Sequence, residues 1–506
     1  MKTKKNKARR FLPIAAVFFG ILFILAAVVY ILTRWVDATY DVDFNTLIYT
    51  MLSPLKGTGN SVVDSILQAC LPSAVLCLVL YIISALVLCQ SRVSVSLAFG
   101  SRRRRIDLLK WLRRIGAAAC IGSLAAACLF CNRVLGIRSW WENQQQNTTI
   151  YEDYYVDPDS VSITLNGEAK NLIYIYLESA ETTYASVEEG GAQEVNYIPN
   201  MTALAKEHIS FSDKEGLGGF RPSVGTVWTM SALFGTTTGI PFSFPADGNA
   251  MDQRETFASG VTALGDILAE YGYRQEFLCG SDADFAGRRN YFEQHGNYEI
   301  FDYYTAIEKG YIASDYYVWW GFEDAILYEI ARDELTRLAS GEQPFNFTFL
   351  TVDQHHIDGY VCEQCGDEYE IQLANVLACS DRLLADFIDW CKQQDFYEDT
   401  VIVISGDHPR MDTTLVDGVN YADRTIYNCF INTEKTVALS EKNREFTTLD
   451  MFPTVLSALG FDIEGDRLGL GTDLFSATRT LAEELSYAYL EQELSKSSLY
   501  YISRFA

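Results

Sequence analysis

Basic side chains are scarce in most of this chain. Residues 151–506 carry 22 Lys and Arg against 60 Asp and Glu, whereas residues 1–150 carry 18 and 6. Nucleic-acid binding needs clustered Lys and Arg that neutralise phosphates, so this balance excludes a nucleic-acid partner. Solubility is the simplest role of the acidity. Because an acidic surface repels anions, any phosphate site here must be made locally positive, and a metal ion would supply that charge.

Histidine is also rare, and the sequence shows no internal repeat and no low-complexity tract. Only five histidines are present. Three of them, His355, His356 and His408, directly follow apolar runs typical of β-strands. This placement makes them candidates for a site at the ends of strands.

The twelve cysteines fall into two groups. Six lie in or beside hydrophobic segments, where they act as small apolar side chains. The other six are Cys279, Cys362, Cys365, Cys379, Cys391 and Cys429. The spacing Cys362-Glu-Gln-Cys365 suits a short disulfide in an oxidising space. A zinc site would need a second pair of ligands at suitable spacing, and the sequence shows none. We therefore expect a disulfide or free thiols here.

Long hydrophobic runs are confined to the first part of the chain. They cover about residues 11–33, 66–89 and 115–131. A membrane-spanning helix needs about 20 apolar residues, so the third run, which is rich in Ala and Gly, is the shortest candidate. The first run is too long for the core of a signal peptide, and no small-x-small cleavage site follows it. We expect residues 1–136 to form a membrane domain of three transmembrane helices.

Positive charge sets the expected orientation of these helices. Six basic residues precede the first run, and Arg102–Arg105 follow the second, whereas the loop between the two runs contains only Arg34 and Lys56. Loops rich in Lys and Arg stay in the cytoplasm. Three spans then place everything after about residue 137 outside the cytoplasm, in a multi-pass protein of the cell membrane.

The remainder of the chain alternates between strand-like and helix-like runs. Residues 137–165 are polar and aromatic and are expected to be a linker. The expected strands are 171–177, 274–279, 345–352, 400–405 and 428–432, and the expected helices are 200–208, 227–235, 261–271, 319–340, 369–394 and 448–459. Such alternation predicts an α/β fold with a mainly parallel sheet between helices. We place this domain at 166–480, with 481–506 as a C-terminal tail that has no assigned role.

Polar side chains follow two of the expected strands. Glu178 ends one apolar run, and Asp407-His408 ends another. Two carboxylates and one imidazole suit a divalent ion such as Mn²⁺, Mg²⁺ or Zn²⁺. Each residue by itself has an ordinary structural role, as a cap or an ion-pair partner. Together they predict a metal site at the carboxyl ends of the strands.

Three further residues are candidates for chemistry. Thr226 precedes a helix-like run, where a hydroxyl would be stabilised as an alkoxide by the helix amino terminus, or would simply cap the helix. Arg288 lies in a loop after the strand 274–279 and suits phosphate binding. His355 is placed to donate to a phosphoryl oxygen or a leaving group, or it is a structural histidine.

The order of these motifs resembles that of the alkaline phosphatase–sulfatase superfamily. More narrowly, it is similar to the membrane-anchored phosphoglycerol transferases and lipoteichoic acid synthases. The stretches that carry the likeness are 225–230 with 239–241, 285–288, 355–359, 448–454 and 467–474. Lipoteichoic acid synthases have His and Trp where this chain has Cys279 and Ala286, which favours the branch that modifies periplasmic glucans. Sulfatases need a Cys/Ser-x-Pro-x-Arg motif, which Thr226-Val227-Trp228-Thr229 does not match.

The resemblance implies an alkaline-phosphatase-like catalytic domain and a role for each candidate. Glu178, Asp407 and His408 would bind one divalent ion, expected to be Mn²⁺, with Thr226 as ligand and nucleophile. Arg288 and His355 would contact the phosphoglycerol group. Phosphatidylglycerol would be the lipid donor, a covalent phospho-threonine the intermediate, and a glycan or glycolipid the acceptor.

Three alternatives remain open from the sequence. A phosphoethanolamine transferase would use the same threonine chemistry on another head group. A sulfatase-like phosphodiesterase would pass the group to water. An inactive, membrane-tethered binding protein would hold no metal at all.

Overall fold

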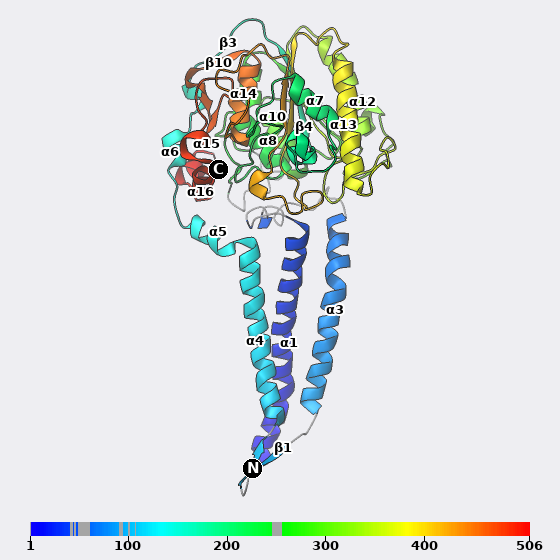
Figure 1. Ribbon diagram of the computed structural model, residues 1–506, viewed down its shortest axis with the longest axis vertical. Helices are drawn as coiled ribbons and strands as arrows, with labels where there is room; N and C mark the ends of the chain where they lie inside the picture. Colours follow the sequence, from blue (N-terminus) through cyan, green and yellow to red (C-terminus); the bar gives the residue numbers. More distant parts are fainter. Residues whose placement is uncertain are drawn as a thin grey trace. The chain divides into compact units, whose positions relative to one another are not determined.

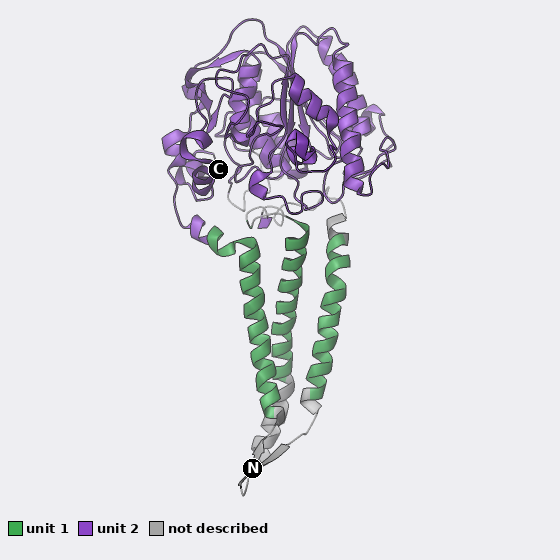
Figure 2. Ribbon diagram, viewed as in Figure 1, with its two compact units in different colours: residues 1–44, 60–140 green, residues 45–59, 141–506 purple. Residues whose placement is uncertain are grey.

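The computed structural model (Figure 1) describes residues 2–40, 44, 47–48, 61–90, 95–99, 102–106, 108–244 and 256–505. The chain forms two compact units (Figure 2). Unit 1 consists of residues 1–44 and 60–140, and unit 2 consists of residues 45–59 and 141–506. The predicted domain boundaries near residues 136 and 165 stay predictions.

Three long helices make up most of unit 1. They are α1 (Lys2–Thr39), α3 (Ser61–Gln90) and α4 (Leu108–Leu135). An antiparallel pair of strands, β1 (Val95–Phe99) and β2 (Arg102–Ile106), lies between α3 and α4 in the chain. Helix α1 packs against both α3 and α4. Each helix contains a stretch long and apolar enough to cross a membrane: Ile14–Thr39, Ser65–Val87 and Lys110–Leu135.

The side chains of these helices identify unit 1 as membrane-spanning. Large apolar side chains such as Ile21, Leu71 and Leu129 are more than half uncovered by other protein atoms. Contact of such surface with water is unfavourable, whereas contact with lipid is favourable. The three predicted spans are therefore confirmed. The third is longer than predicted, since it runs from Lys110 to Leu135. Arg102–Arg105 lie on β2, whereas Lys56 lies outside the described residues.

A six-stranded sheet forms the centre of unit 2. Its order is β6-β5-β7-β4-β8-β9, in which β9 alone pairs antiparallel to its neighbour. The strands are β4 (Asn171–Leu177), β5 (Arg274–Cys279), β6 (Glu299–Phe301), β7 (Phe345–Leu350), β8 (Thr400–Gly406) and β9 (Asn428–Ile431). The predicted mainly parallel sheet is thus confirmed. The edge strands differ from prediction, since β6 is too short to give a sequence signal and β9 reverses direction.

Helices cover both faces of this sheet (Figure 1). Alternate residues of β4 point to opposite sides: Tyr174 and Tyr176 belong to one apolar core and Ile173 and Ile175 to the other. Because both faces are buried, the strand is apolar throughout, with every residue from Leu172 to Leu177 buried.

The helices divide between the two cores. Those with side chains in the core of Tyr174 are α8 (Thr229–Thr238), α9 (Leu264–Glu270), α10 (Arg288–Gln294) and α14 (Met451–Ala458). Those with side chains in the core of Ile173 are α7 (Pro199–Glu207), α11 (Tyr303–Lys309), α12 (Asp324–Ala339) and α13 (Gln372–Cys391). Helix α13 shows why: Leu373, Leu377, Leu384 and Ile388 recur at helical spacing and are all buried.

Local signals explain where two of these helices begin. The predicted start near residue 448 is confirmed, because the backbone N–H of Thr447 donates to Asp450 Oδ2 (2.7 Å) and a 3₁₀ turn leads into α14. The helix predicted from residue 319 instead starts at Asp324. Trp319 and Gly321 have φ of +53° and +155°, values that a right-handed helix does not allow.

Short elements complete unit 2. They are α5 (Ile137–Gln144), which straddles the division between the units, α6 (Ile150–Tyr154), β3 (Ile163–Leu165), β10 (Phe461–Ile463), β11 (Arg467–Leu468), β12 (Gly471–Thr472), α15 (Leu481–Leu485), α16 (Tyr487–Leu494) and α17 (Leu499–Arg504). Tyr151 from the expected linker and Tyr501 from the expected tail are both buried, and their rings lie 5.4 Å apart in a T-shaped contact. Parts of both segments therefore belong to the core of unit 2.

Candidate active site

The strand order brings the predicted metal ligands together. Strand β4 lies between β7 and β8 in the sheet, and all three run in the same direction. Glu178 follows β4, Asp407-His408 follow the apolar part of β8, and His355 lies in the loop after β7. Their side chains therefore gather beyond the carboxyl ends of three adjacent strands.

Glu178, Asp407 and His408 form a compact, buried cluster. His408 Nε2 lies 3.6 Å from Glu178 Oε1 and 3.4 Å from Asp407 Oδ2. Each of the three side chains is at most 2% exposed. The intervening Ser179 supports both carboxylates, since its backbone N–H donates to Asp407 Oδ1 (2.7 Å) and its hydroxyl to Glu178 Oε1 (2.7 Å). Ser179 has φ of +52°, a costly backbone value that occurs mainly where function requires it.

The imidazole of His408 is oriented for ligation. Its Nδ1 lies 2.8 Å from the carbonyl oxygen of Pro409, so Nδ1 carries the proton and Nε2 presents its lone pair to the two carboxylates. Burial disfavours the charged ring, but Asp407 and Glu178 outweigh burial and raise the pKa of His408. The two carboxylates therefore stabilise positive charge on the His408 side chain.

The two carboxylates are close enough to disturb one another. Burial, with the neighbouring Glu178, raises the pKa of Asp407 to about 7. Burial also disfavours the ionised form of Glu178, but His355, His408 and Ser179 outweigh it and lower the pKa of that carboxyl.

The cluster fits a divalent metal ion. Within the described part of the chain, Asp407 Oδ2 is buried and accepts no hydrogen bond. A buried carboxylate oxygen without a donor is costly unless a cation meets it. The ligand atoms of Glu178, Asp407 and His408 lie within 4.8 Å of one another, close enough to share an ion. The oxygen and imidazole donors suit Mn²⁺, Mg²⁺ or Zn²⁺.

Among the described residues, the hydrogen bonds of the Thr226 side chain go to Ser223 and Thr448 and not to this cluster. Its hydroxyl donates to the Ser223 carbonyl oxygen (2.9 Å) and to Thr448 Oγ1 (3.1 Å), and accepts from the Ser223 backbone N–H (2.9 Å). The side chain is fully buried, and its methyl group packs close to Gly235 of α8. These contacts give Thr226 a structural role in the turn before α8. Its role as ligand and nucleophile stays a prediction.

A different threonine lies at the cluster. Thr229 Oγ1 is 3.3 Å from Glu178 Oε2 and 3.4 Å from His408 Nε2. Thr229 is the first residue of α8 and is half-buried. The positive end of the helix dipole stabilises negative charge at this position. Sequence reasoning missed it because Thr226 and Thr229 both precede the same apolar run.

His355 and Arg288 are connected by two aromatic side chains, Trp320 and Phe285, in tilted ring contacts. The ring of Trp320 lies 4.6 Å from that of His355 and 5.5 Å from that of Phe285, and the Arg288 guanidinium lies 5.5 Å from the Phe285 ring. Burial lowers the pKa of His355, although Glu178 opposes this, and its Nδ1 bonds to the His356 carbonyl oxygen (2.9 Å). His355 is therefore a neutral ring with Nε2 available.

Arg288 holds its own loop together. It is buried and donates to Ser281 Oγ (3.0 Å) and to the carbonyl oxygens of Asp282 (2.9 Å) and Phe285 (3.1 Å). Arg288 thus contacts Phe285, which contacts Trp320 beside His355. The hydrogen bonds of Arg288 stabilise the loop after β5.

A buried ion-pair network, which the sequence did not suggest, supports the ligand loops. Arg424 binds both oxygens of Glu181 (2.6 and 2.9 Å), and the backbone N–H of Arg410 donates to Glu181 Oε1 (3.0 Å). Arg410 Nη1 in turn donates to the carbonyl oxygen of Gln354 (2.6 Å), beside His355. The network therefore fixes the loop after β8 against the loop after β7.

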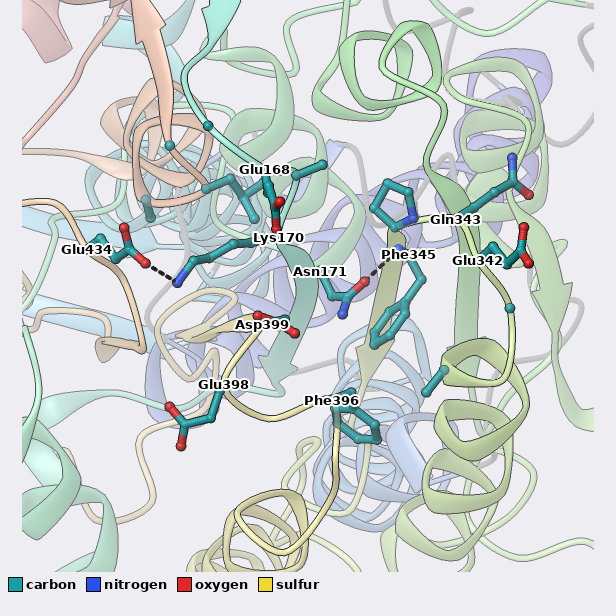
Figure 3. A pocket seen from close by; sticks show the side chains of 18 of the residues that line it. Glu168, Lys170, Asn171, Glu342, Gln343, Phe345, Phe396, Glu398, Asp399 and Glu434 are labelled. Atoms are coloured by element: carbon teal, nitrogen blue, oxygen red, sulfur yellow. Dashed lines mark hydrogen bonds and ion pairs between the residues drawn. The ribbon is translucent and has the colours of Figure 1, made fainter.

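A large hollow of unit 2 lies at the opposite ends of the strands (Figure 3). It measures about 1010 Å³ and includes Asn171 at the start of β4 and Phe345 at the start of β7. Lys170 on its wall pairs with Glu434 (2.8 Å), and Asn171 accepts from the Phe345 N–H (3.0 Å). Parallel α/β sheets carry their sites at the other ends, so size does not make this hollow the active site.

Comparison with known proteins identifies the family. The family model named Sulfatase matches residues 170–461. This chain belongs to the sulfatase family. The predicted resemblance to the alkaline phosphatase–sulfatase superfamily is confirmed, and the family domain contains all six predicted site residues.

Two curated relatives of this sulfatase-family chain are named Phosphoglycerol transferase I. That of Xanthomonas euvesicatoria pv. vesicatoria is 31% identical over 303 residues, and that of Escherichia coli (strain 55989 / EAEC) is 32% identical over 336 residues. The alignments cover 57% and 64% of this chain, and 41% of each relative. The chain therefore matches less than half the length of these relatives.

Two solved structures are similar over much of the chain. The lipoteichoic acid synthase LtaP of Listeria monocytogenes has a TM-score of 0.49 at 18% identity, covering 62% of this chain and 79% of its own. The lipooligosaccharide phosphoethanolamine transferase EptA of Neisseria meningitidis has a TM-score of 0.47 at 12% identity, covering 88% and 84%.

Proposed function

We propose that this protein is a membrane-anchored transferase that moves phosphoglycerol from phosphatidylglycerol to a glycan or glycolipid acceptor. The observation that carries the proposal is a threonine hydroxyl, Thr229 Oγ1, at a helix amino terminus and beside a buried cluster of two carboxylates and one imidazole. This arrangement suits phosphoryl transfer through a covalent enzyme intermediate. The choice of phosphoglycerol rests on the two relatives.

The first half-reaction transfers the head group to the enzyme. Thr229 Oγ attacks the phosphorus of phosphatidylglycerol and loses its hydroxyl proton, the bond between phosphorus and the diacylglycerol oxygen breaks, and that oxygen takes up one proton, so diacylglycerol leaves and the step is balanced. Glu178 and His408 contact the attacking hydroxyl and orient it. The amino terminus of α8 stabilises the negative charge that develops there.

The second half-reaction releases the head group. An acceptor hydroxyl attacks the phosphorus of phospho-Thr229, the bond to Thr229 Oγ breaks, and Thr229 regains a proton. His355 is neutral and its Nδ1 is held by the His356 carbonyl, so Nε2 is the atom that takes the proton from the acceptor hydroxyl. Arg288 keeps Phe285, and through it Trp320, beside this imidazole.

Glu178, Asp407 and His408 would hold one divalent metal ion, and Mn²⁺ is our choice among ions that suit these donors. When bound, such an ion supplies positive charge that lowers the pKa of a nearby hydroxyl and neutralises a phosphoryl group. We assign the hydroxyl beside this ion to Thr229, in place of the predicted Thr226.

Unit 1 supports a lipid donor and a location at the membrane. Three membrane-spanning helices keep the enzyme at the surface where phosphatidylglycerol resides. The basic residues at the N-terminus and at Arg102–Arg105 favour a cytoplasmic side for both, which places unit 2 outside the cytoplasm after three crossings.

The test uses the full-length chain in detergent with Mn²⁺ and fluorescent phosphatidylglycerol, followed by intact-protein and peptide mass spectrometry. We expect release of diacylglycerol and a glycerol-phosphate adduct on Thr229. An adduct on Thr226 would refute the assignment of the nucleophile.

If only phosphatidylethanolamine gives an adduct, the enzyme is a phosphoethanolamine transferase. Glycerol phosphate released to water, with no transfer to any acceptor, would indicate a phosphodiesterase. The absence of metal and turnover would indicate a binding protein.

A further inference from the structure

Three cysteine side chains of unit 2 converge away from the candidate active site. Cys362 and Cys365 lie in the loop between β7 and α13, and Cys379 lies on α13. Cys362 Sγ is 3.6 Å from Cys365 Sγ and 3.9 Å from Cys379 Sγ. All three are free thiols. The sequence showed the first two as a pair, and the fold adds the third.

The separations of these sulfur atoms match those of ligands around one metal ion. With zinc–sulfur bonds of about 2.3 Å, tetrahedral thiolate ligands lie about 3.8 Å apart. Disulfide sulfurs are about 2.0 Å apart. The sulfur atoms of the three cysteines lie within 4.8 Å of one another, so a single ion can reach all of them.

The loop presents these cysteines in a turn suited to thiolate ligation. The backbone N–H of Cys365 donates to the Cys362 carbonyl oxygen (3.1 Å), which closes a turn and brings the two thiols to the same side of the loop.

A side chain beside the cluster fixes its two parts together. Arg382 of α13 donates to the carbonyl oxygen of Gln364 (3.1 Å) in the loop and to that of Ala378 (3.2 Å) in the helix. These carbonyls directly precede Cys365 and Cys379 in the chain. The arginine therefore holds the two ligand-bearing segments in register before any ion arrives.

We propose that Cys362, Cys365 and Cys379 bind one zinc ion as thiolates. Binding displaces the thiol protons into solvent and forms three zinc–sulfur bonds. Within the described residues, no further His, Cys, Asp or Glu joins the group, so a water molecule completes the tetrahedron. Cys365 is half-buried, whereas Cys362 and Cys379 are at most 5% exposed, so the ion enters on the side of Cys365.

The site complements the cluster of Glu178, Asp407 and His408. Soft thiolates select zinc, whereas carboxylates and imidazole suit Mn²⁺ or Mg²⁺, so one chain holds two ions of different character. The zinc site ties to α13 the loop that also carries His355.

The experiment titrates the reduced, full-length chain in detergent with Co²⁺ and follows thiolate-to-cobalt charge-transfer absorption in the near ultraviolet. We expect this absorption to saturate at one equivalent and to disappear on addition of Zn²⁺. Cys365→Ser and Cys379→Ser should abolish it. Cys391→Ser is the matched control, because Cys391 is buried in the same helix and belongs to no such group. The active-site cluster has no sulfur ligand and gives no such band.

Alkylation of the unmodified chain provides a second measurement that does not depend on folding of the variants. Zinc should slow the alkylation of Cys365 by at least about tenfold, since a bound thiolate is withdrawn from reaction. Two results would overturn the proposal: no charge-transfer band in the reduced chain, or a disulfide among the three cysteines in freshly isolated protein that contains no zinc. Either result leaves the proposed transferase activity standing.

Discussion

Replacing Thr229 with valine removes one oxygen atom and keeps the shape of the side chain. The hydroxyl makes two long contacts, at 3.3 and 3.4 Å, to Glu178 and His408. Each net hydrogen bond is worth about 1 kcal/mol or less at such distances, so we expect the melting temperature to fall by no more than about 2 °C. The nucleophile is lost completely, and the initial rate of diacylglycerol release should fall by at least about 1000-fold, or about 4 kcal/mol.

The matched variant is Thr226→Val, which should have the opposite effects. The Thr226 hydroxyl is buried and satisfies the backbone N–H of Ser223. Its loss leaves that donor unpaired, at a cost of about 1–3 kcal/mol in the free energy of unfolding. The rate per folded molecule should stay within about fivefold of the wild type, since Thr226 contacts no group of the cluster.

The assay measures diacylglycerol release and thermal unfolding on the same preparations. If Thr226→Val abolishes release without loss of stability, while Thr229→Val keeps more than about a tenth of the rate, then our assignment of the nucleophile is wrong.

The remaining predictions concern the metal and two buried acids. Chelation should lower the melting temperature and abolish turnover. Added Mn²⁺ should restore both in the wild type but not in His408→Ala. Equal melting temperatures with and without chelator would contradict the metal site. Arg424→Met leaves Glu181 buried without its bidentate partner. The free energy of unfolding, measured by denaturant titration, should therefore fall by about 3–5 kcal/mol. A change below about 1 kcal/mol would contradict this expectation. Burial, with Glu334 nearby, outweighs the ion pair with Arg337 and raises the pKa of Glu276 to about 7. The folded state therefore holds this proton more tightly than the unfolded one, and stability falls as the pH rises from about 4.5 to 7. Glu276→Gln should therefore melt at a higher temperature than wild type at pH 8 and at the same temperature at pH 4, and a difference independent of pH would contradict the buried-acid explanation.

Much of the central fold could be predicted from sequence. The strands β4, β5 and β8 are apolar runs buried on both faces, and their predicted bounds agree with the structure to within a residue. Long apolar helices with unpaired hydrophobic surface likewise identify the three membrane spans. The bounds were less accurate at the helix that starts at Asp324, because a turn with positive φ at Trp319 precedes it.

The metal ligands were predictable because of a property of parallel sheets. Glu178 and Asp407-His408 directly follow apolar strands, and parallel strands place such residues at one edge. The sequence thus determined the family, the membrane anchor and the grouping of these three side chains. These features are local patterns, and each can be recognised within a few tens of residues.

Tertiary structure alone decided which hydroxyl and which thiols are neighbours. Thr226 and Thr229 are three residues apart, and only the turn that buries Thr226 against Thr448 leaves Thr229 facing Glu178 and His408. Cys379 joins Cys362 and Cys365 only because α13 packs beside the loop after β7. Contacts between distant segments depend on how helices pack on the sheet, and that packing is a property of the whole core.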